Sequence, residues 1–278
     1  MRKLPFFQLD VFSAVPFKGN PLAVIAEADG LEDAQMQAIA NWTNLSETTF
    51  LSRPKDAAAD YHVRIFTPSR ELPFAGHPTL GSCHAWLALG HRPKAEHVVQ
   101  ECGAGLVRIK RDGARLAFAA PPLRRSGDVD GELRSRIAAS LGVSEQTIKA
   151  AQWVDNGPGW IAVLLGSRRE VLALKLDGSL LPGQSLGVVA PWDPAQDGNE
   201  AQFEVRAFTS RHTEDPVTGS LNAGLAQWLI GAGLAKPRYI AAQGTVLGRA
   251  GRVHVAQEGD AIWIGGDVAP CIAGTITL

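Results

Sequence analysis

The sequence predicts an α+β protein of two pseudo-symmetric domains, each a mixed curved β-sheet or barrel wrapped around one central buried helix. Three observations support this prediction. A strand–turn–helix segment occurs twice, both copies end in a helix without a charged face, and the rest of the chain divides into many short apolar runs typical of strands. The prediction is therefore a duplicated domain in which each copy folds around its own helix.

The repeat joins residues 63–87 to residues 205–229 at a shift of 142 positions, without a gap in the alignment. A period this long indicates a duplicated domain rather than a solenoid. The identical pairs are Val63 and Val205, Arg64 and Arg206, Phe66-Thr67 and Phe208-Thr209, and Trp86-Leu87 and Trp228-Leu229.

Each copy is expected to contain a buried helix. In the second copy apolar residues recur at helical spacing from a start near Gly219-Ser220, and residues 217–235 contain no charge. In the first copy Pro78 suits a first helical turn, and residues 72–91 contain no formal charge. A helix without a charged face is usually buried. The backbone N–H groups at its start can hold a carboxylate or phosphate.

The remaining elements follow from shorter patterns. Helices are expected at 32–42 and 132–141, and residues 121–131 have the polar, Gly- and Pro-containing composition of a linker. The domains are then 1–120, completed by a returning C-terminal strand at about 266–278, and 121–265. Strands are expected at 6–11, 22–26, 46–51, 61–67, 97–101, 106–110, 115–119, 152–155, 160–165, 170–174, 186–190, 203–209, 239–241, 252–256, 261–264 and 272–278.

Composition excludes several classes of function. The chain has 27 basic and 28 acidic residues and no basic run, which argues against a nucleic-acid partner. Its three cysteines are too few and too scattered for a disulfide framework or a zinc knuckle. The N-terminus lacks the apolar core of a signal peptide, and the uncharged stretch 217–235 contains too many polar residues for a membrane span. A soluble cytoplasmic protein is expected.

Three short motifs favour other chemistry but lack the context it needs. Residues 183–187 match the nucleophile elbow G-x-S-x-G, yet a strand pattern follows where a helix is required. Residues 76–82 have the glycine spacing of a phosphate loop without its lysine. Cys83-His84 beside His77 offers no carboxylate ligand, so helix-start and core roles are favoured over a metal site.

The candidate acid–base groups are Glu47, His77 and Asp215. Glu47 occurs in a half-buried strand, where desolvation would raise the pKa of its carboxyl group and let it exchange a proton near neutral pH. The alternatives are a solvated strand end for Glu47, a helix cap for His77 and a turn residue for Asp215. If the domains pack about a pseudo-twofold axis, both helix starts would face one cleft and hold a small anionic substrate.

Four segments, 7–25, 44–51, 64–82 and 206–224, together resemble the phenazine-biosynthesis PhzF-like family, and the resemblance extends from end to end. The family shares the duplicated fold of diaminopimelate epimerase. The resemblance implies two similar domains with the active site between them, a homodimer, and no cofactor or metal.

The resemblance also implies roles for particular residues. Glu47 in NLSETTF matches the family's general acid/base, and Asp215 in EDPVTGS matches an aspartate at the second helix start. The epimerases use two cysteines, and the corresponding positions here resemble Gly76 and Asp215, so two-thiol racemisation is not expected. Asn20 in GNP matches a cleft residue, Gly76-His77 in AGHPT matches the stretch at the first helix start, and Ser220 matches a serine that helps bind the substrate carboxylate. The expected substrate-binding residues are Asn20, Gly76, Gly219 and Ser220.

The expected function is therefore a cofactor-independent isomerase that moves a proton and a double bond within a small carboxylate-bearing substrate, as the phenazine isomerase does with a dihydro-hydroxyanthranilate. In this reading Glu47 carries the proton, while His77 and Asp215 position the substrate and assist the transfer. Two alternatives stay open: an amino-acid epimerase with non-cysteine bases, and a binding protein that retains the cleft without catalysis. The sequence does not identify the substrate or pathway.

Overall fold

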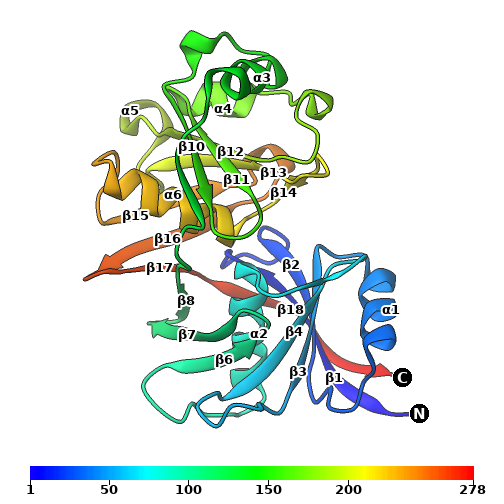
Figure 1. The fold of residues 1–278 in the computed structure, drawn as a ribbon. Helices are drawn as coiled ribbons and strands as arrows, with labels where there is room; N and C mark the ends of the chain where they lie inside the picture. Colours follow the sequence, from blue (N-terminus) through cyan, green and yellow to red (C-terminus); the bar gives the residue numbers. More distant parts are fainter. The chain divides into compact units, whose positions relative to one another are not determined.

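The computed structural model describes residues 1–278, which divide into two compact units. Unit 1 contains residues 1–119 and 265–278, and unit 2 contains residues 120–264. Figure 1 shows that strands dominate both units and that each unit has a central helix, α2 or α6. The predicted α+β class is confirmed. None of the helices is long and apolar enough to span a membrane.

The strands of unit 1 form one mixed sheet in the order β18-β1-β2-β3-β4-β6-β7-β8, with the short β5 on β4. The pairs β2–β3 and β4–β6 are parallel and the others are antiparallel. Their bounds are β1 Lys3–Val11, β2 Asn20–Ile25, β3 Glu47–Ser52, β4 Tyr61–Phe66, β5 Glu71–Leu72, β6 Val98–Cys102, β7 Gly105–Asp112, β8 Arg115–Ala119 and β18 Val268–Thr277.

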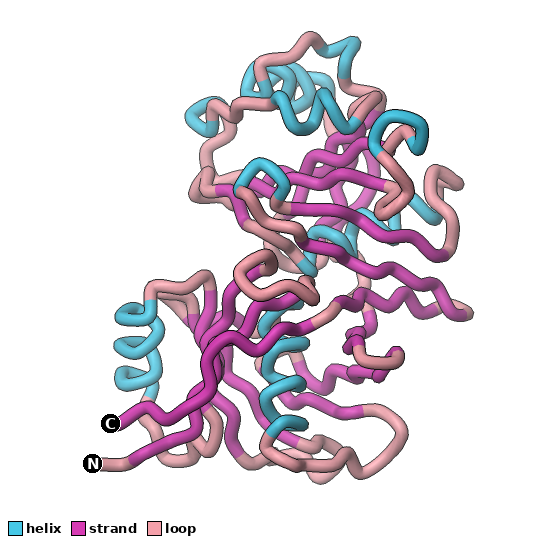
Figure 2. Tube along the Cα trace, turned by 180° about the vertical axis from the view of Figure 1, so that it is seen from behind, coloured by secondary structure: helices cyan, strands magenta, loops and turns pink.

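The chain ends meet in unit 1. Strand β18 lies antiparallel to β1, with Lys3 opposite Thr277. The N–H of Arg2 donates to the carbonyl of Leu278, and the N–H of Leu278 donates to the carbonyl of Arg2, both at 2.9 Å. Figure 2 shows the two ends side by side. The last strand is therefore part of the first sheet.

Two helices pack on the sheet of unit 1. Helix α1 (Asp33–Thr43) buries Met36 and Ala40 in a cluster with Phe50 and Phe66, as its apolar spacing predicts. Helix α2 (Gly76–Ala88) contacts β1, β2, β3, β6, β8 and β18, so strands surround it. Ten of its 13 residues are buried, which confirms the expectation from its lack of charge.

Unit 2 repeats this topology. Its strand order is β9-β10-β11-β12-β13-β15-β16, with β14 on β13, and the parallel pairs β11–β12 and β13–β15 match β2–β3 and β4–β6. Strand β9 occupies beside β10 the place that β18 occupies beside β1. The bounds are β9 Arg125–Asp128, β10 Ala150–Asp155, β11 Trp160–Leu164, β12 Ser185–Pro191, β13 Phe203–Phe208, β14 Glu214–Asp215, β15 Arg238–Gln243 and β16 Gly251–Glu258, with β17 (Ala261–Gly266) at the boundary between the units.

The central helix of unit 2, α6 (Gly219–Gly231), packs on β10, β11 and β16, and nine of its 13 residues are buried. The smaller helices α3 (Gly131–Leu141), α4 (Arg168–Ala173) and α5 (Pro194–Asp197) have side-chain N-caps. Helices α3 and α4 supply Ile137 and Val171 to a second apolar cluster with Val188 of β12.

The gapless alignment of the two copies is wrong by one residue. The strands β4 and β13 keep the shift of 142, but the turns after them contain residues 67–70 and 209–213, four and five residues long. The helices α2 and α6 are therefore related by 143 positions. In the corrected alignment Gly76 is equivalent to Gly219, and His77 is equivalent to Ser220. The glutamates Glu71 and Glu214 also become equivalent.

An arginine in each strand confirms the corrected register. Arg64 of β4 binds Glu71 with an Nη2–Oε2 distance of 2.7 Å, and Arg206 of β13 binds Glu214 with the same atoms 2.8 Å apart. Both pairs are bidentate, because each Nε also donates to the other carboxylate oxygen. The extra residue is absorbed in the second turn, where His212 has a φ of 63°.

Two sequence predictions for unit 2 are wrong. The expected strand 170–174 is helix α4, because Ser167 accepts a hydrogen bond from the N–H of Glu170 and caps a helical turn. The expected linker 121–131 contains strand β9, which pairs with β10 although all four of its residues are exposed. An exposed edge strand needs no apolar alternation, so the pattern gave no signal for it.

A close approach between α6 and β10 predicts different effects for two glycines of the same helix. A Cβ on Gly224 would lie 2.3 Å from the carbonyl oxygen of Val154, whereas a Cβ on Gly231 would meet nothing within 4 Å. We expect Gly224→Ala to lower the free energy of unfolding by about 1–3 kcal/mol. Gly231→Ala should change it by less than about 1 kcal/mol, in the stabilising direction. Urea unfolding of both variants measures the difference, and equal effects would contradict the close approach.

Candidate active site

Unit 1 brings four of the predicted site residues to the start of helix α2. Asn20 is the first residue of β2, Glu47 is the first residue of β3, and Gly76-His77 opens α2. Strands β2 and β3 are parallel, with Leu22 opposite Glu47, so both begin at the same edge of the sheet. Strand β4 is antiparallel to β3 and therefore ends at that edge, so helix α2 begins there and crosses back to the parallel strand β6.

His77 links Asn20 to Glu47. Its Nε2 lies 3.2 Å from Oε2 of Glu47, and its Nδ1 lies 3.4 Å from Nδ2 of Asn20. Asn20 and His77 are buried, and the Glu47 side chain is only 14% exposed. The structural alternatives considered for these two residues are therefore wrong. Glu47 is not a solvated strand end, and the His77 ring contacts side chains rather than capping the helix.

The protonation of His77 follows from its surroundings. Complete burial lowers the pKa of the imidazole to about 3, because the charged form loses its hydration. The ring is therefore neutral at physiological pH. An amide –NH₂ can only donate, so with Nδ2 of Asn20 facing it, Nδ1 is the acceptor. The ring proton is then on Nε2, so a neutral N–H lies 3.2 Å from Oε2 of Glu47 and the contact is not an ion pair.

The starts of the two central helices differ from those of the smaller helices. Neither α2 nor α6 has a side-chain N-cap or an acidic residue in its first turn. By contrast, Asp130, Ser167 and Asp193 accept hydrogen bonds from the first turns of α3, α4 and α5. The first-turn N–H groups of the two central helices are therefore not used by a cap, and such groups favour an anion.

Unit 2 places Asp215 beside the start of α6. Asp215 ends β14 and lies opposite Ala207 of β13. The hydroxyl of Thr218, the N-cap residue of α6, donates to Oδ2 of Asp215. The neighbouring Glu214 binds the guanidinium of Arg206. Asp215 is thus more than a turn residue, because its carboxylate is held against the helix start by a hydrogen bond.

Ser220 is oriented by two residues that sequence reasoning missed. The indole Nε1 of Trp160 donates to Oγ of Ser220 at 3.0 Å, and Nδ2 of Asn156 donates to the Ser220 carbonyl at 2.8 Å. An indole N–H only donates, so the proton of the Ser220 hydroxyl is directed elsewhere and can serve an anion. These contacts span 60 or more positions in the chain, and no local pattern signals them.

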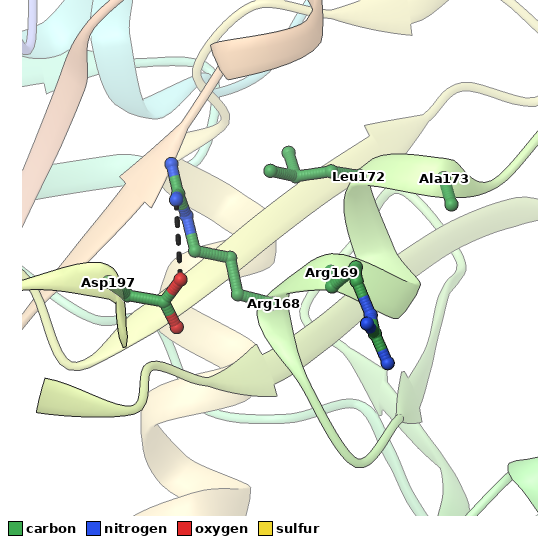
Figure 3. Close-up of a pocket in the computed structure, with 5 residues that line it drawn as sticks. All are labelled: Arg168, Arg169, Leu172, Ala173 and Asp197. Atoms are coloured by element: carbon green, nitrogen blue, oxygen red, sulfur yellow. Dashed lines mark hydrogen bonds and ion pairs between the residues drawn. The ribbon is translucent and has the colours of Figure 1, made fainter. Parts of the chain in front are cut away.

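A hollow of about 430 Å³ in unit 2 lies apart from these residues. It is lined by Arg168, Arg169, Leu172, Ala173 and Asp197 (Figure 3). The dashed line in Figure 3 joins Arg168 to Asp197, an Nη1–Oδ1 distance of 3.4 Å, and its Nε also bonds the buried Glu204 at 3.0 Å. The Arg168 charge is therefore satisfied within the protein, and no predicted site residue lines this hollow.

The discounted motifs have structural roles. Ser185 of the G-x-S-x-G match begins strand β12 and donates to the carbonyl of Pro158, so no nucleophile elbow forms. Cys83 lies inside α2, where burial raises the pKa of its thiol to about 12. No group of three or more His, Cys, Asp and Glu side chains is arranged to hold a metal ion.

Comparisons with known proteins identify the family. A family model described as phenazine biosynthesis-like protein matches residues 9–274. Antisense-enhancing sequence 1 of Schizosaccharomyces pombe is 36% identical, with 99% of each chain covered. Trans-2,3-dihydro-3-hydroxyanthranilate isomerase of Pseudomonas fluorescens is 33% identical, with 91% of this chain and 90% of that protein covered.

Solved structures agree with this assignment. A phenazine biosynthesis protein of the PhzF family from Enterococcus faecalis superposes with a TM-score of 0.82 at 26% identity, covering all of both chains. A hydroxyproline epimerase from Agrobacterium vitis shares the fold, with a TM-score of 0.60 at 15% identity over 99% of this chain and 92% of that one. The chain belongs to the phenazine biosynthesis-like family of isomerases, with the diaminopimelate epimerase-like fold.

Proposed function

We propose that this isomerase moves a proton, and with it a double bond, within a small cyclic substrate that carries a carboxylate. The observation that supports the proposal most is the buried contact between His77 and Glu47 at the start of α2. It provides one carboxylate, oriented by a neutral donor, in a place from which most water is excluded. A single base of this kind suits transfer of a proton between two carbons of the same molecule.

In the proposed reaction the Glu47 carboxylate removes a proton from carbon. The electron pair of that C–H bond forms a new double bond, the existing double bond shifts along the ring, and its far carbon takes the proton back from Glu47. The substrate is neither oxidised nor reduced, and the base returns to its starting state. His77 donates its Nε2 proton to Glu47 throughout and positions the carboxylate, since its low pKa makes it a poor source of a cationic acid.

We further propose that each unit offers groups that suit a small anionic substrate. The Ser220 hydroxyl, which accepts from Trp160 and keeps its own proton to donate, suits a carboxylate, and so do the first-turn N–H groups of α2 and of α6. Asp215 suits an amino or hydroxyl group as an acceptor. Trans-2,3-dihydro-3-hydroxyanthranilate has this pattern of groups. It is the first compound to test, because relatives in Pseudomonas fluorescens and Pseudomonas chlororaphis are named as its isomerases.

The positions of the cysteines favour the proton shift over the epimerase alternative. A predicted epimerase from Pseudomonas aeruginosa is 25% identical with a TM-score of 0.78 over 99% of both chains, which keeps this reaction under consideration. Inversion at a carbon normally uses one base on each face. Gly76 and Asp215 occupy the positions expected for the two epimerase cysteines. The three cysteines of this chain lie elsewhere: Cys83 and Cys102 are buried, and Cys271 is in β18. A proton shift by one carboxylate fits these residues better.

Replacing the proposed base should stop proton transfer. We expect Glu47→Gln to lower the rate at which solvent deuterium enters trans-2,3-dihydro-3-hydroxyanthranilate by about 10²–10⁴-fold, because an amide cannot take the proton. ¹H NMR in D₂O measures the exchange. The control is Glu96→Gln, which changes an exposed glutamate in the same unit. Equal rates in the wild type and Glu47→Gln would remove Glu47 from this role, and inversion without a double-bond shift would favour the epimerase.

His77 should remain neutral throughout the working pH range. The low pKa caused by burial predicts that its ¹⁵N signals do not titrate between pH 5 and 8, and the contact with Asn20 predicts the Nε2–H tautomer. Below about pH 6.5 the unfolded chain takes up a proton at this position that the folded chain does not. The stability due to the neutral ring is therefore complete above pH 6.5 and is lost as pH falls toward 3, at up to about 1.4 kcal/mol per pH unit. A titration midpoint near neutrality would contradict this assignment.

A further inference from the structure

We propose that Gln243, at the end of β15, is a positioning residue for Asp215 and acts through the hydroxyl of Thr218. The inference rests on the proposed role of Asp215 in substrate binding and proton transfer. Gln243 is 1% exposed and follows the C-terminus of α6 by twelve positions, 243 − 231. It lies in no motif that relates the chain to its family, and it contacts Asp215 only through the fold.

The side-chain amide of Gln243 makes four hydrogen bonds, all to the segment that begins α6. Its Oε1 accepts from the backbone N–H of Thr218 at 3.1 Å and from Nδ2 of Asn222 at 2.9 Å. Its Nε2 donates to the carbonyl of Asp215 at 3.1 Å and to Oγ1 of Thr218 at 3.0 Å. Every donor and the acceptor oxygen of this amide is thus in use.

Two backbone groups fix which way the amide points. The N–H of Thr218 can only donate, so it requires the oxygen of Gln243, and the carbonyl of Asp215 can only accept, so it requires the nitrogen. Oγ1 of Thr218 must therefore accept from Gln243 Nε2. The hydroxyl proton of Thr218 is then directed to Oδ2 of Asp215, where the structure places that bond. Gln243 thereby determines which way the threonine donates.

Thr218 is the N-cap residue of α6, but its side chain does not cap the helix. A threonine at an N-cap normally accepts a hydrogen bond from an N–H group of the first turn, but the Thr218 hydroxyl makes no such bond. Its oxygen faces Gln243 and its proton faces Asp215. The network orients one carboxylate oxygen, stabilises the ionised form of Asp215, and leaves the first-turn N–H groups unused by the cap. A purely structural cap would do none of these three things.

The first repeat contains the same glutamine without the acid. Gln100 of β6 is related to Gln243 by 143 positions, and it bonds Oγ1 of Thr79, which is related to Asn222 by the same shift. Gln100 is 0% exposed and also accepts from the Tyr61 hydroxyl at 3.0 Å. It anchors the first turn of α2 but bonds no carboxylate. It is therefore a matched control that separates anchoring of a helix from positioning of an acid.

The experiment uses the full chain, four single variants, and the double variant that combines Gln243→Met with Thr218→Val. Gln243→Met removes both bonds to the threonine, Thr218→Val removes the hydroxyl, Thr218→Ser retains it, and Gln100→Met is the control. The first measurement is a ¹³C NMR titration of the Asp215 carboxyl carbon in the ligand-free protein. Every variant keeps the charged side chains of the neighbouring strands, which are Glu204 and Arg206 of β13, Glu214 of β14 and Arg238 of β15, and it also keeps Arg249, which follows the 3-10 helix Thr245–Leu247.

We expect the Asp215 signal to titrate at a pH higher by roughly one unit in Gln243→Met and in Thr218→Val, because the ionised carboxyl loses the hydrogen bond from Thr218. Thr218→Ser and Gln100→Met should match the wild type. The same titration in Gln243→Met as in the wild type would overturn the proposal, as would an equal displacement in Gln100→Met. If Gln243→Met does not fold, the valine and serine variants decide by the same criterion.

The second measurement is turnover of trans-2,3-dihydro-3-hydroxyanthranilate. We expect kcat/KM to fall about 10- to 100-fold in Gln243→Met and in Thr218→Val, and no further in the double variant, because both act through one bond. Additive losses would contradict action through Thr218. A wild-type protein that fails to act on this compound would contradict the proposed function, whereas the titration of Asp215 would still decide the role of Gln243.

Discussion

The burial of one uncharged helix in each repeat is the constraint on which the rest of the structure depends. A helix surrounded by strands cannot expose a charged face, and both α2 and α6 lack one. The same absence of charge extends to their first turns, which have neither an acidic residue nor a side-chain cap. Packing thus creates two helix starts with unused N–H groups, which is the chemistry that an anion requires.

Burial also decides what the surrounding polar groups can do. His77 is in the first turn of α2, where burial disfavours its charged form, so it presents a neutral ring to Glu47 at Nε2. In the second repeat, Thr218 and Gln243 hold Asp215 with uncharged groups. Each unit therefore places a neutral donor beside one carboxylate, and such a donor orients the acid.

The duplication keeps the scaffold and changes the chemistry. Both repeats share the strand order, the bidentate arginine–glutamate pair and the buried glutamine behind the central helix. One extra residue in the second turn moves α6 to a shift of 143, and His77 then corresponds to Ser220. The first repeat offers a histidine–glutamate pair, whereas the second offers an aspartate and a serine. The two repeats therefore carry different chemical groups on the same scaffold.

The sequence by itself determined the fold class and the duplication, because burial leaves periodic apolar runs and charge-free stretches that are visible along the chain. It also placed His77 and Asp215 at helix starts and Glu47 in a half-buried strand, since each lies within or close to a local motif. Helix α4 and strand β9 were missed, because a short capped turn and an exposed edge strand have no periodicity.

Only the tertiary structure decided the direction of the hydrogen bonds. Gln243 reaches Thr218 across 25 positions, and Trp160 reaches Ser220 across 60. Such contacts depend on which strand lies beside which helix, and on how two backbone groups orient one amide. The neutral state of His77 likewise follows from complete burial, which no neighbour in the sequence reveals.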